Sequence, residues 1–103
     1  MVELALTGEP VDAPRAKELG IVNRLVEPGE ALASAHALAA QIAHNAPLAL
    51  SASKAIVQRA GEWTEDEAWQ RQDEIVRPVF SSEDALEGAR AFAEKREPRW
   101  RAR

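Results

Sequence analysis

The chain has 103 residues, the length of one small domain, and it contains no Cys, three Trp and a formal net charge of −4. The acidic balance excludes a polycation that binds nucleic acid through charge alone. The absence of Cys excludes disulfides, thiolate metal sites and Cys nucleophiles. Ala supplies 21 residues, so the 46% hydrophobic fraction hides a modest number of large apolar side chains. Because each buried Ala removes little area from water, the composition predicts a thin core that depends on further contacts.

The sequence carries no sign of a membrane segment or a secretory signal. No apolar run approaches the roughly 20 residues that a membrane helix needs. The N-terminal residues include Glu3 and lack the basic flank of a signal peptide. We therefore expect a cytoplasmic protein.

Two short helices and one strand are predicted in the first 30 residues. Residues 3–7 are typical of a helix end, because Gly8 follows them. Residues 13–19 predict a second helix, with Asp12 as its N-cap. The β-branched and apolar residues at 21–26 predict a strand. A strand needs a neighbour for its backbone groups, so its partner is expected in missing sequence or in another subunit.

The remainder of the chain is predicted to be helical, which makes the fold class mostly α. A helix begins near Glu30 and ends at Asn45, which can adopt the left-handed conformation. Pro47 opens the next helix at its first position. A capping box at residues 64–67 opens the third helix. The fourth follows a Ser-rich cap that includes Ser82.

No catalytic or metal-binding cluster is predicted from the residues themselves. His36 and His44 are eight residues apart, and no carboxylate stands at a ligand spacing between them. The serines within the helices lack an adjacent base, and the acids at 65–67 are typical of a cap and a solvated face.

Opposite charges are concentrated in neighbouring segments near the C-terminus. Residues 61–94 have a net charge of −7, and residues 95–103 have a net charge of +4. The basic tail has two interpretations. In the first, the tail binds an anion, with its Lys and Arg side chains contacting phosphates. In the second, its charges compensate the negative end of the preceding helix dipole, and the rest of the tail is a frayed terminus.

The order of these features resembles the enoyl-CoA hydratase/isomerase (crotonase) superfamily. The resemblance begins with the run Glu3 to Gly8 and continues through Gly20-Ile21-Val22-Asn23 and Ala46-Pro47-Leu48-Ala49. It ends with Ser82-Glu83-Asp84, Glu87-Gly88, Ala91-Phe92 and Glu94-Lys95-Arg96 followed by Pro98. The resemblance spans nearly the whole chain and corresponds to the C-terminal portion of the family.

The resemblance implies a division of the chain and a short set of site residues. Residues 1–30 correspond to the end of the α/β spiral core, and residues 31–103 to the C-terminal helical region that trimerises and lies over the acyl-CoA site. It implies that Phe92 lines the acyl region and that Lys95 approaches the adenosine phosphates of CoA. Glu97 stands where family members often have another basic residue.

The resemblance also implies what this chain alone lacks. The oxyanion hole and the catalytic acids of the family precede the position of Met1, so no catalytic residue carries over. We expect a fragment of an enzyme of acyl-CoA metabolism that is inactive alone, needs no cofactor beyond its thioester substrate, and forms a homo-oligomer or joins the missing part. The alternatives are a standalone helical module that self-associates or binds a full-length paralogue, and an acidic protein that grips RNA with its tail.

Overall fold

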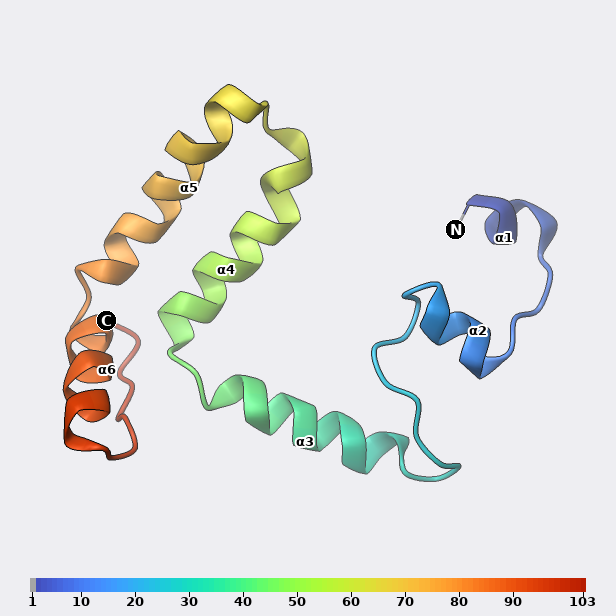
Figure 1. Cartoon of the computed structure of the whole chain (residues 1–103), viewed down its shortest axis with the longest axis horizontal. Helices are drawn as coiled ribbons and strands as arrows, with labels where there is room; N and C mark the ends of the chain where they lie inside the picture. The colour runs from blue at the N-terminus through green and yellow to red at the C-terminus, as the bar shows by residue number, and fades with distance from the viewer. Residues whose placement is uncertain (1) are drawn as a thin grey trace. The chain divides into compact units, whose positions relative to one another are not determined.

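The computed structural model describes residues 2–103, and within these residues it contains helices and no β-strand (Figure 1). The elements are α1 (Val2–Thr7), α2 (Ala13–Glu18), α3 (Ala31–Ala43), α4 (Pro47–Arg59), η1 (Ala60–Glu62, a 3-10 turn), α5 (Glu65–Phe80) and α6 (Glu83–Glu94). The chain divides into two compact units, one that ends at Ala37 and one that spans Leu38–Arg103. The mostly helical class is confirmed, and none of the described helices is long and apolar enough to cross a membrane.

Local hydrogen bonds define the two short helices of the first unit. Helix α1 ends before Gly8, whose φ of 67° is the left-handed conformation that Gly adopts without a steric penalty. Helix α2 begins where the Asp12 carboxylate accepts a hydrogen bond from the Arg15 backbone N–H at 2.9 Å. Both of these predicted boundaries are confirmed.

The predicted strand at residues 21–26 is wrong. These residues are exposed and run as irregular chain between α2 and α3. Ile21 N–H donates to the Ala16 carbonyl at 2.9 Å, which closes the end of α2 instead of pairing with a strand. β-branched side chains favour extended backbone, but a ladder forms only when a second strand supplies donors and acceptors. The part of the chain that the structure describes contains no such second strand.

The junction between α3 and α4 differs from its prediction in one detail. Lys95 and Ala102 are the non-Gly residues with positive φ in the described chain, so Asn45 does not adopt the left-handed conformation. Its side-chain Nδ2 instead donates to the carbonyls of Gln41 and Ile42, at 3.2 and 3.1 Å. The Asn45 side chain thus donates hydrogen bonds to helix-end carbonyls that the backbone N–H groups of a left-handed turn would otherwise bond. Pro47 opens α4 as predicted.

Helices α4 and α5 pack against each other in the second unit (Figure 1). The turn between them ends at the predicted capping box, where the Glu67 carboxylate accepts from Thr64 Oγ1 at 3.1 Å and from Thr64 N–H at 3.5 Å. The interior is as thin as the Ala-rich composition predicts. Among the described residues, the buried hydrophobic side chains are Ala52 and Ala91.

Candidate functional site

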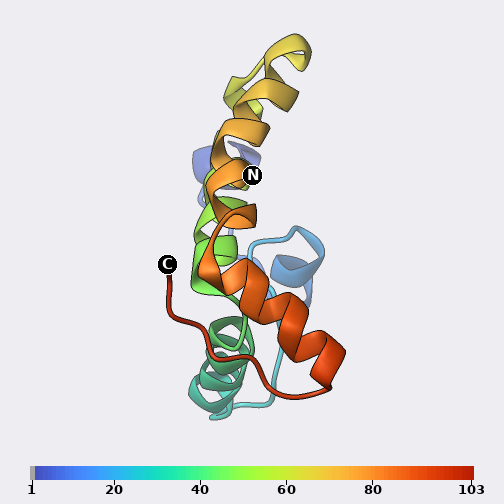
Figure 2. The same ribbon diagram turned by 90° about the vertical axis from the view of Figure 1, so that its left-hand side faces the viewer.

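The last nine residues, 95–103, form a segment that we call the C-terminal strap. It leaves the end of α6 and runs back along this helix to its first turn (Figures 1 and 2). At the far end, Asp84 N–H donates to the Arg103 carbonyl at 3.2 Å. The strap is therefore an ordered part of the second unit, and the interpretation of the tail as a frayed terminus is wrong.

The Asp84 side chain fixes the far half of the strap by accepting hydrogen bonds from the strap's backbone. Asp84 is 2% exposed, and its two carboxylate oxygens accept from Arg101 N–H at 2.7 Å and Ala102 N–H at 2.9 Å. Ser82 precedes it as the N-cap of α6 and accepts from Ala85 N–H at 3.1 Å. A buried carboxylate is stable only when it is paired and hydrogen-bonded, and here the strap backbone supplies the donors.

Glu87 lies one turn further along α6 and holds the near half of the strap. Its carboxylate receives two bonds from the Arg96 guanidinium, at 2.6 and 3.0 Å, and one from Arg99 N–H at 2.8 Å. The bonds from Arg96 and then that from Arg99 lower the pKa of Glu87 from 4.5 to about 2. Arg96 also donates to Glu94 at 2.6 Å, so its guanidinium is engaged on two sides.

Trp100 joins the strap to the junction between α3 and α4. Its Nε1 donates to the His44 carbonyl at 2.8 Å. Its ring lies over Gly88 of α6, where an added Cβ would stand 3.2 Å from the nearest ring atom. The His44 side chain also meets Glu97 of the strap, at 2.9 Å. Gly88 therefore makes room for the indole against α6.

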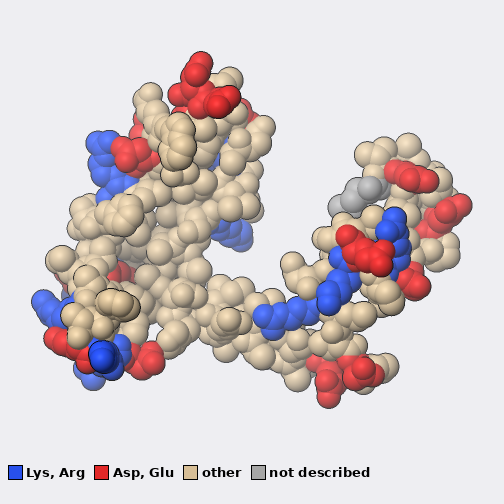
Figure 3. Space-filling view, in the orientation of Figure 1, with Lys and Arg blue, Asp and Glu red and all other residues tan. Residues whose placement is uncertain are grey.

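The two oppositely charged segments of the sequence meet in space. Acidic and basic side chains are mixed around α6 and the strap, whereas acids gather at the turn between α4 and α5 (Figure 3). Arg96 and Arg103 pair with Glu87 and Glu83, at 2.6 and 3.0 Å. Much of the basic charge of the tail is thus compensated by α6.

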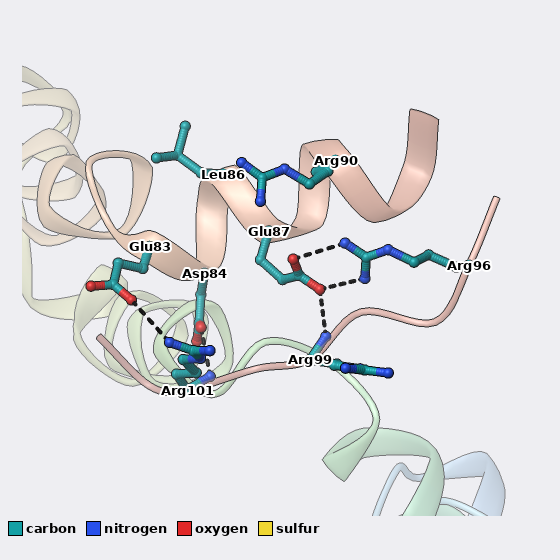
Figure 4. A pocket seen from close by; sticks show the side chains of 8 residues that line it. All are labelled: Glu83, Asp84, Leu86, Glu87, Arg90, Arg96, Arg99 and Arg101. Carbon is teal, nitrogen blue, oxygen red and sulfur yellow. Dashed lines mark hydrogen bonds and ion pairs between the residues drawn. The ribbon is translucent and has the colours of Figure 1, made fainter. Parts of the chain in front are cut away.

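A groove of about 520 Å³ lies between α6 and the strap (Figure 4). Asp84 and Glu87, the two carboxylates that bond to the strap and that we call the clamp, line this groove. Leu86 is its single large apolar side chain. The other lining residues are Glu83, Arg90, Arg96, Arg99 and Arg101. A groove with this lining suits ion pairs and does not suit an acyl chain.

The two predicted site residues lie at the end of α6, beyond this groove. Phe92 is 88% exposed. Lys95 follows the last turn with a φ of 52°, and its N–H donates to the Phe92 carbonyl at 3.3 Å. The structure thus places both residues at the same helix end, with their side chains exposed.

Asp84 and Glu87 are the site residues that the sequence did not single out. Their signal was visible only as part of a family motif, because the bonds join residues 12 to 18 positions apart. Local patterns do not encode such contacts. Within residues 2–103, no cluster of three or more His, Asp or Glu could hold a metal ion.

Comparisons with known proteins agree on one family. The sequence pattern of the family described as "Enoyl-CoA hydratase/isomerase" matches residues 1–103. A carnitinyl-CoA dehydratase of Salmonella heidelberg is 40% identical over 105 residues, which cover 98% of this chain and 40% of that protein. A crystal structure of an enoyl-CoA hydratase from Mycobacterium tuberculosis matches with a TM-score of 0.96 and 52% identity, over 99% of this chain and 40% of that one.

A second solved enoyl-CoA hydratase, from Mycobacterium marinum, matches with a TM-score of 0.94 and 51% identity over the same shares. The chain thus spans 40% of the length of the relatives that it matches. The match extends from the first helix to the strap. The chain therefore belongs to the enoyl-CoA hydratase/isomerase family.

Proposed function

We propose that this chain supplies the C-terminal helical region of an enzyme of acyl-CoA metabolism. In this proposal residues 1–30 are the end of the spiral core, and residues 31–103 form the region that oligomerises and lies over the acyl-CoA site. The whole enzyme would add or remove water across a 2,3-double bond, with an oxyanion hole that stabilises the thioester enolate. The length of the relatives and the match over residues 1–103 support this assignment.

The observation that carries the proposal is the amount of apolar surface that the chain leaves uncovered. Large apolar side chains stand open on α4 and α5, including Val57 (78%), Trp69 (76%) and Phe80 (78%). Faces of this kind are typical of protein interfaces. We assign them to contacts with the rest of the fold and with other copies.

Phe92 and Lys95 are the residues that we propose contact acyl-CoA. Phe92 is the most exposed of the large apolar side chains, so it is available to line an acyl group that a neighbouring part of the enzyme encloses. Lys95 is exposed beside it and offers a positive charge to the phosphates of CoA. Glu97 is paired with His44 and adds no positive charge to this contact.

We further propose that the chain is catalytically inactive alone. Its clamped carboxylates Asp84 and Glu87 accept hydrogen bonds from the strap and are not available to transfer a proton to a substrate. We place the protein in the cytoplasm, with acyl-CoA as its ligand, with no cofactor beyond the thioester, and with no nucleic-acid or membrane partner.

Two measurements on the purified chain test this function. Loss of the conjugated enoyl thioester of a short 2-enoyl-CoA reports hydration, with the full-length relative from Mycobacterium tuberculosis as the positive control. We expect no turnover by the chain. Turnover that point mutations in the chain itself abolish would overturn the proposal.

Sedimentation of the same sample tests the exposed faces. We expect a species heavier than 11.3 kDa, because the apolar faces associate. Substitution of Trp69 by Ser should shift this species toward the monomer, whereas Glu62→Gln, a matched exposed position, should not. A folded monomer would contradict both the oligomerisation role and the alternative of a self-associating module.

A further inference from the structure

We propose that α6 and the strap form one body that pivots at Ser82 and is held in place by a latch on His44. We call residues 82–103 the C-terminal body, and the contacts of Trp100 and Glu97 with His44 the latch. The closed latch fixes where α6 lies relative to the junction between α3 and α4. Opening the latch frees the body to turn as one piece. The proposed acyl-CoA ligand plays no part in this device.

The C-terminal body is held together from within. Three of the four buried residues of the described chain, Ser82, Asp84 and Ala91, belong to it. The Asp84 carboxylate accepts two hydrogen bonds from the strap backbone, and the Glu87 carboxylate accepts a third. Bonds to a carboxylate are charge-assisted and about twice as strong as neutral ones. The helix and the strap therefore keep their relative positions when the body turns.

The polar contacts between this body and the rest of the chain converge on one residue. Within residues 2–103, the hydrogen bonds and ion pairs that join residues 83–103 to residues 2–80 all end on His44. Trp100 Nε1 donates to the His44 carbonyl at 2.8 Å. The Glu97 carboxylate meets His44 Nε2 at 2.9 Å. The body is thus anchored by polar contacts at a single site beyond its pivot.

The Trp100 bond is the stronger of the two latch contacts. The His44 and Glu97 side chains are 67% and 80% exposed, and exposed pairs of this kind contribute little. The indole N–H, in contrast, can only donate, and its acceptor is an open carbonyl just past the last turn of α3. The Trp100 ring also lies against Gly88, so the indole connects α6 directly to this carbonyl.

Ser82 is the point about which the body turns. Its φ of −79° and ψ of 160° take the chain off the helical path between α5 and α6. Its hydroxyl donates to the Val79 carbonyl at 2.6 Å and accepts from Ala85 N–H at 3.1 Å. The two helices are therefore joined through one extended residue. A few residues at the ends of elements are enough to absorb the backbone rotation of a hinge.

The test measures the distance between spin labels on α4 and α6. The chain has no Cys, so Lys54→Cys and Ala89→Cys, both at exposed positions, take one label each. Labelled chain is diluted with unlabelled chain, so that the distance is measured within one molecule. The variants are Trp100→Phe, which loses the N–H donor, and His44→Ala, which keeps the backbone carbonyl. Trp63→Phe, at the turn between α4 and α5, is the matched control.

We expect one narrow distance in the unaltered chain. Trp100→Phe should raise the fraction of chains outside this distance about fivefold, because one neutral hydrogen bond is lost. His44→Ala and Trp63→Phe should change this fraction by no more than about twofold. The contrast between the first two variants separates the bond to the backbone carbonyl from the contact of the His44 side chain.

Cleavage by trypsin after Arg99 and Arg101 reports whether the body itself stays intact. We expect unchanged cleavage in Trp100→Phe, because the strap remains bonded to α6. Asp84→Asn should speed cleavage about tenfold, because it weakens the bonds within the body.

A distance distribution that Trp100→Phe leaves unchanged would overturn the latch. A broad distribution in the unaltered chain would overturn it as well, since the body would then not be held. Faster cleavage in Trp100→Phe would contradict rotation as one piece. If Trp100→Phe lost its helical circular dichroism, a benzothienyl analogue of Trp100, which keeps the ring shape and lacks the N–H, would take its place. None of these outcomes bears on the acyl-CoA proposal, which turnover and sedimentation decide.

Discussion

The two units of the chain differ in which residue types adopt the left-handed backbone conformation. In the first unit, the described residues with positive φ are Gly8, Gly20 and Gly29. In the second unit they are Lys95 and Ala102, both in the strap. Gly adopts this conformation without a steric penalty, whereas Lys and Ala need contacts that impose it.

At Lys95 these are the bonds of the helix end, where Lys95 N–H and Arg96 N–H donate to the Phe92 and Ala91 carbonyls. The second unit also has bonds between residues that are distant in the sequence. The strap is bonded to residues 12 to 18 positions away, and through Trp100 to His44. The side-chain bonds of the first unit join residues at most four positions apart. The strap is therefore shaped by tertiary structure, and the first unit mainly by its local sequence.

The largest effect is expected from Asp84→Ala. The substitution leaves Arg101 N–H and Ala102 N–H without their buried acceptor, which should lower the free energy of unfolding by about 3 kcal/mol. Urea denaturation followed by circular dichroism measures the loss. Asp12→Ala is the control in the first unit, where loss of an N-cap costs about 1 kcal/mol and affects only α2. Equal losses would show that the strap bonds are no stronger than a local cap.

A smaller effect is expected from Gly88→Val. A side chain at this position meets the Trp100 ring, so the indole must move from α6 and its bond to His44 weakens. We expect a loss of about 2 kcal/mol. Gly61→Val is the matched control, because an added Cβ at Gly61 has no atom within 4 Å. A red shift of Trp100 emission, in a chain with Trp63 and Trp69 replaced by Phe, should accompany the first change and not the second.

Acid should open the near half of the strap at a pH set by Glu87. Its pKa is lowered to about 2 in the folded chain from an unfolded value near 4.5. A lowered carboxylate pKa contributes stability that is complete above about pH 4.5 and is lost as the pH falls toward 2. Trp100 emission in the same chain should therefore change within this window. In Glu87→Gln the change should be absent, and a transition centred above pH 5 would contradict the pairing with Arg96.

Sequence reasoning succeeded where structure is local and failed where it is not. The caps at Asp12 and Ser82 and the box at residues 64–67 follow from side chains that bond within three positions. The strand at 21–26 was predicted from β propensity, but propensity does not supply a partner. The bonds from Asp84 to the strap were missed because a Ser-Glu-Asp run is already fully explained as a helix cap. Phe92 and Lys95 as ligand contacts came from family resemblance and stay predictions.

The smallest effects are expected at the left-handed positions themselves, and they should differ in sign between the units. Lys95→Gly and Ala102→Gly relieve the side-chain strain at φ values of 52° and 58°, so each should raise the free energy of unfolding by up to about 1 kcal/mol. Gly20→Ala places a side chain at a φ of 72° and should lower it by a similar amount. Urea denaturation of the three variants measures these shifts. Destabilisation by Lys95→Gly would show that the Lys side chain stabilises the folded chain by more than its strained backbone conformation costs.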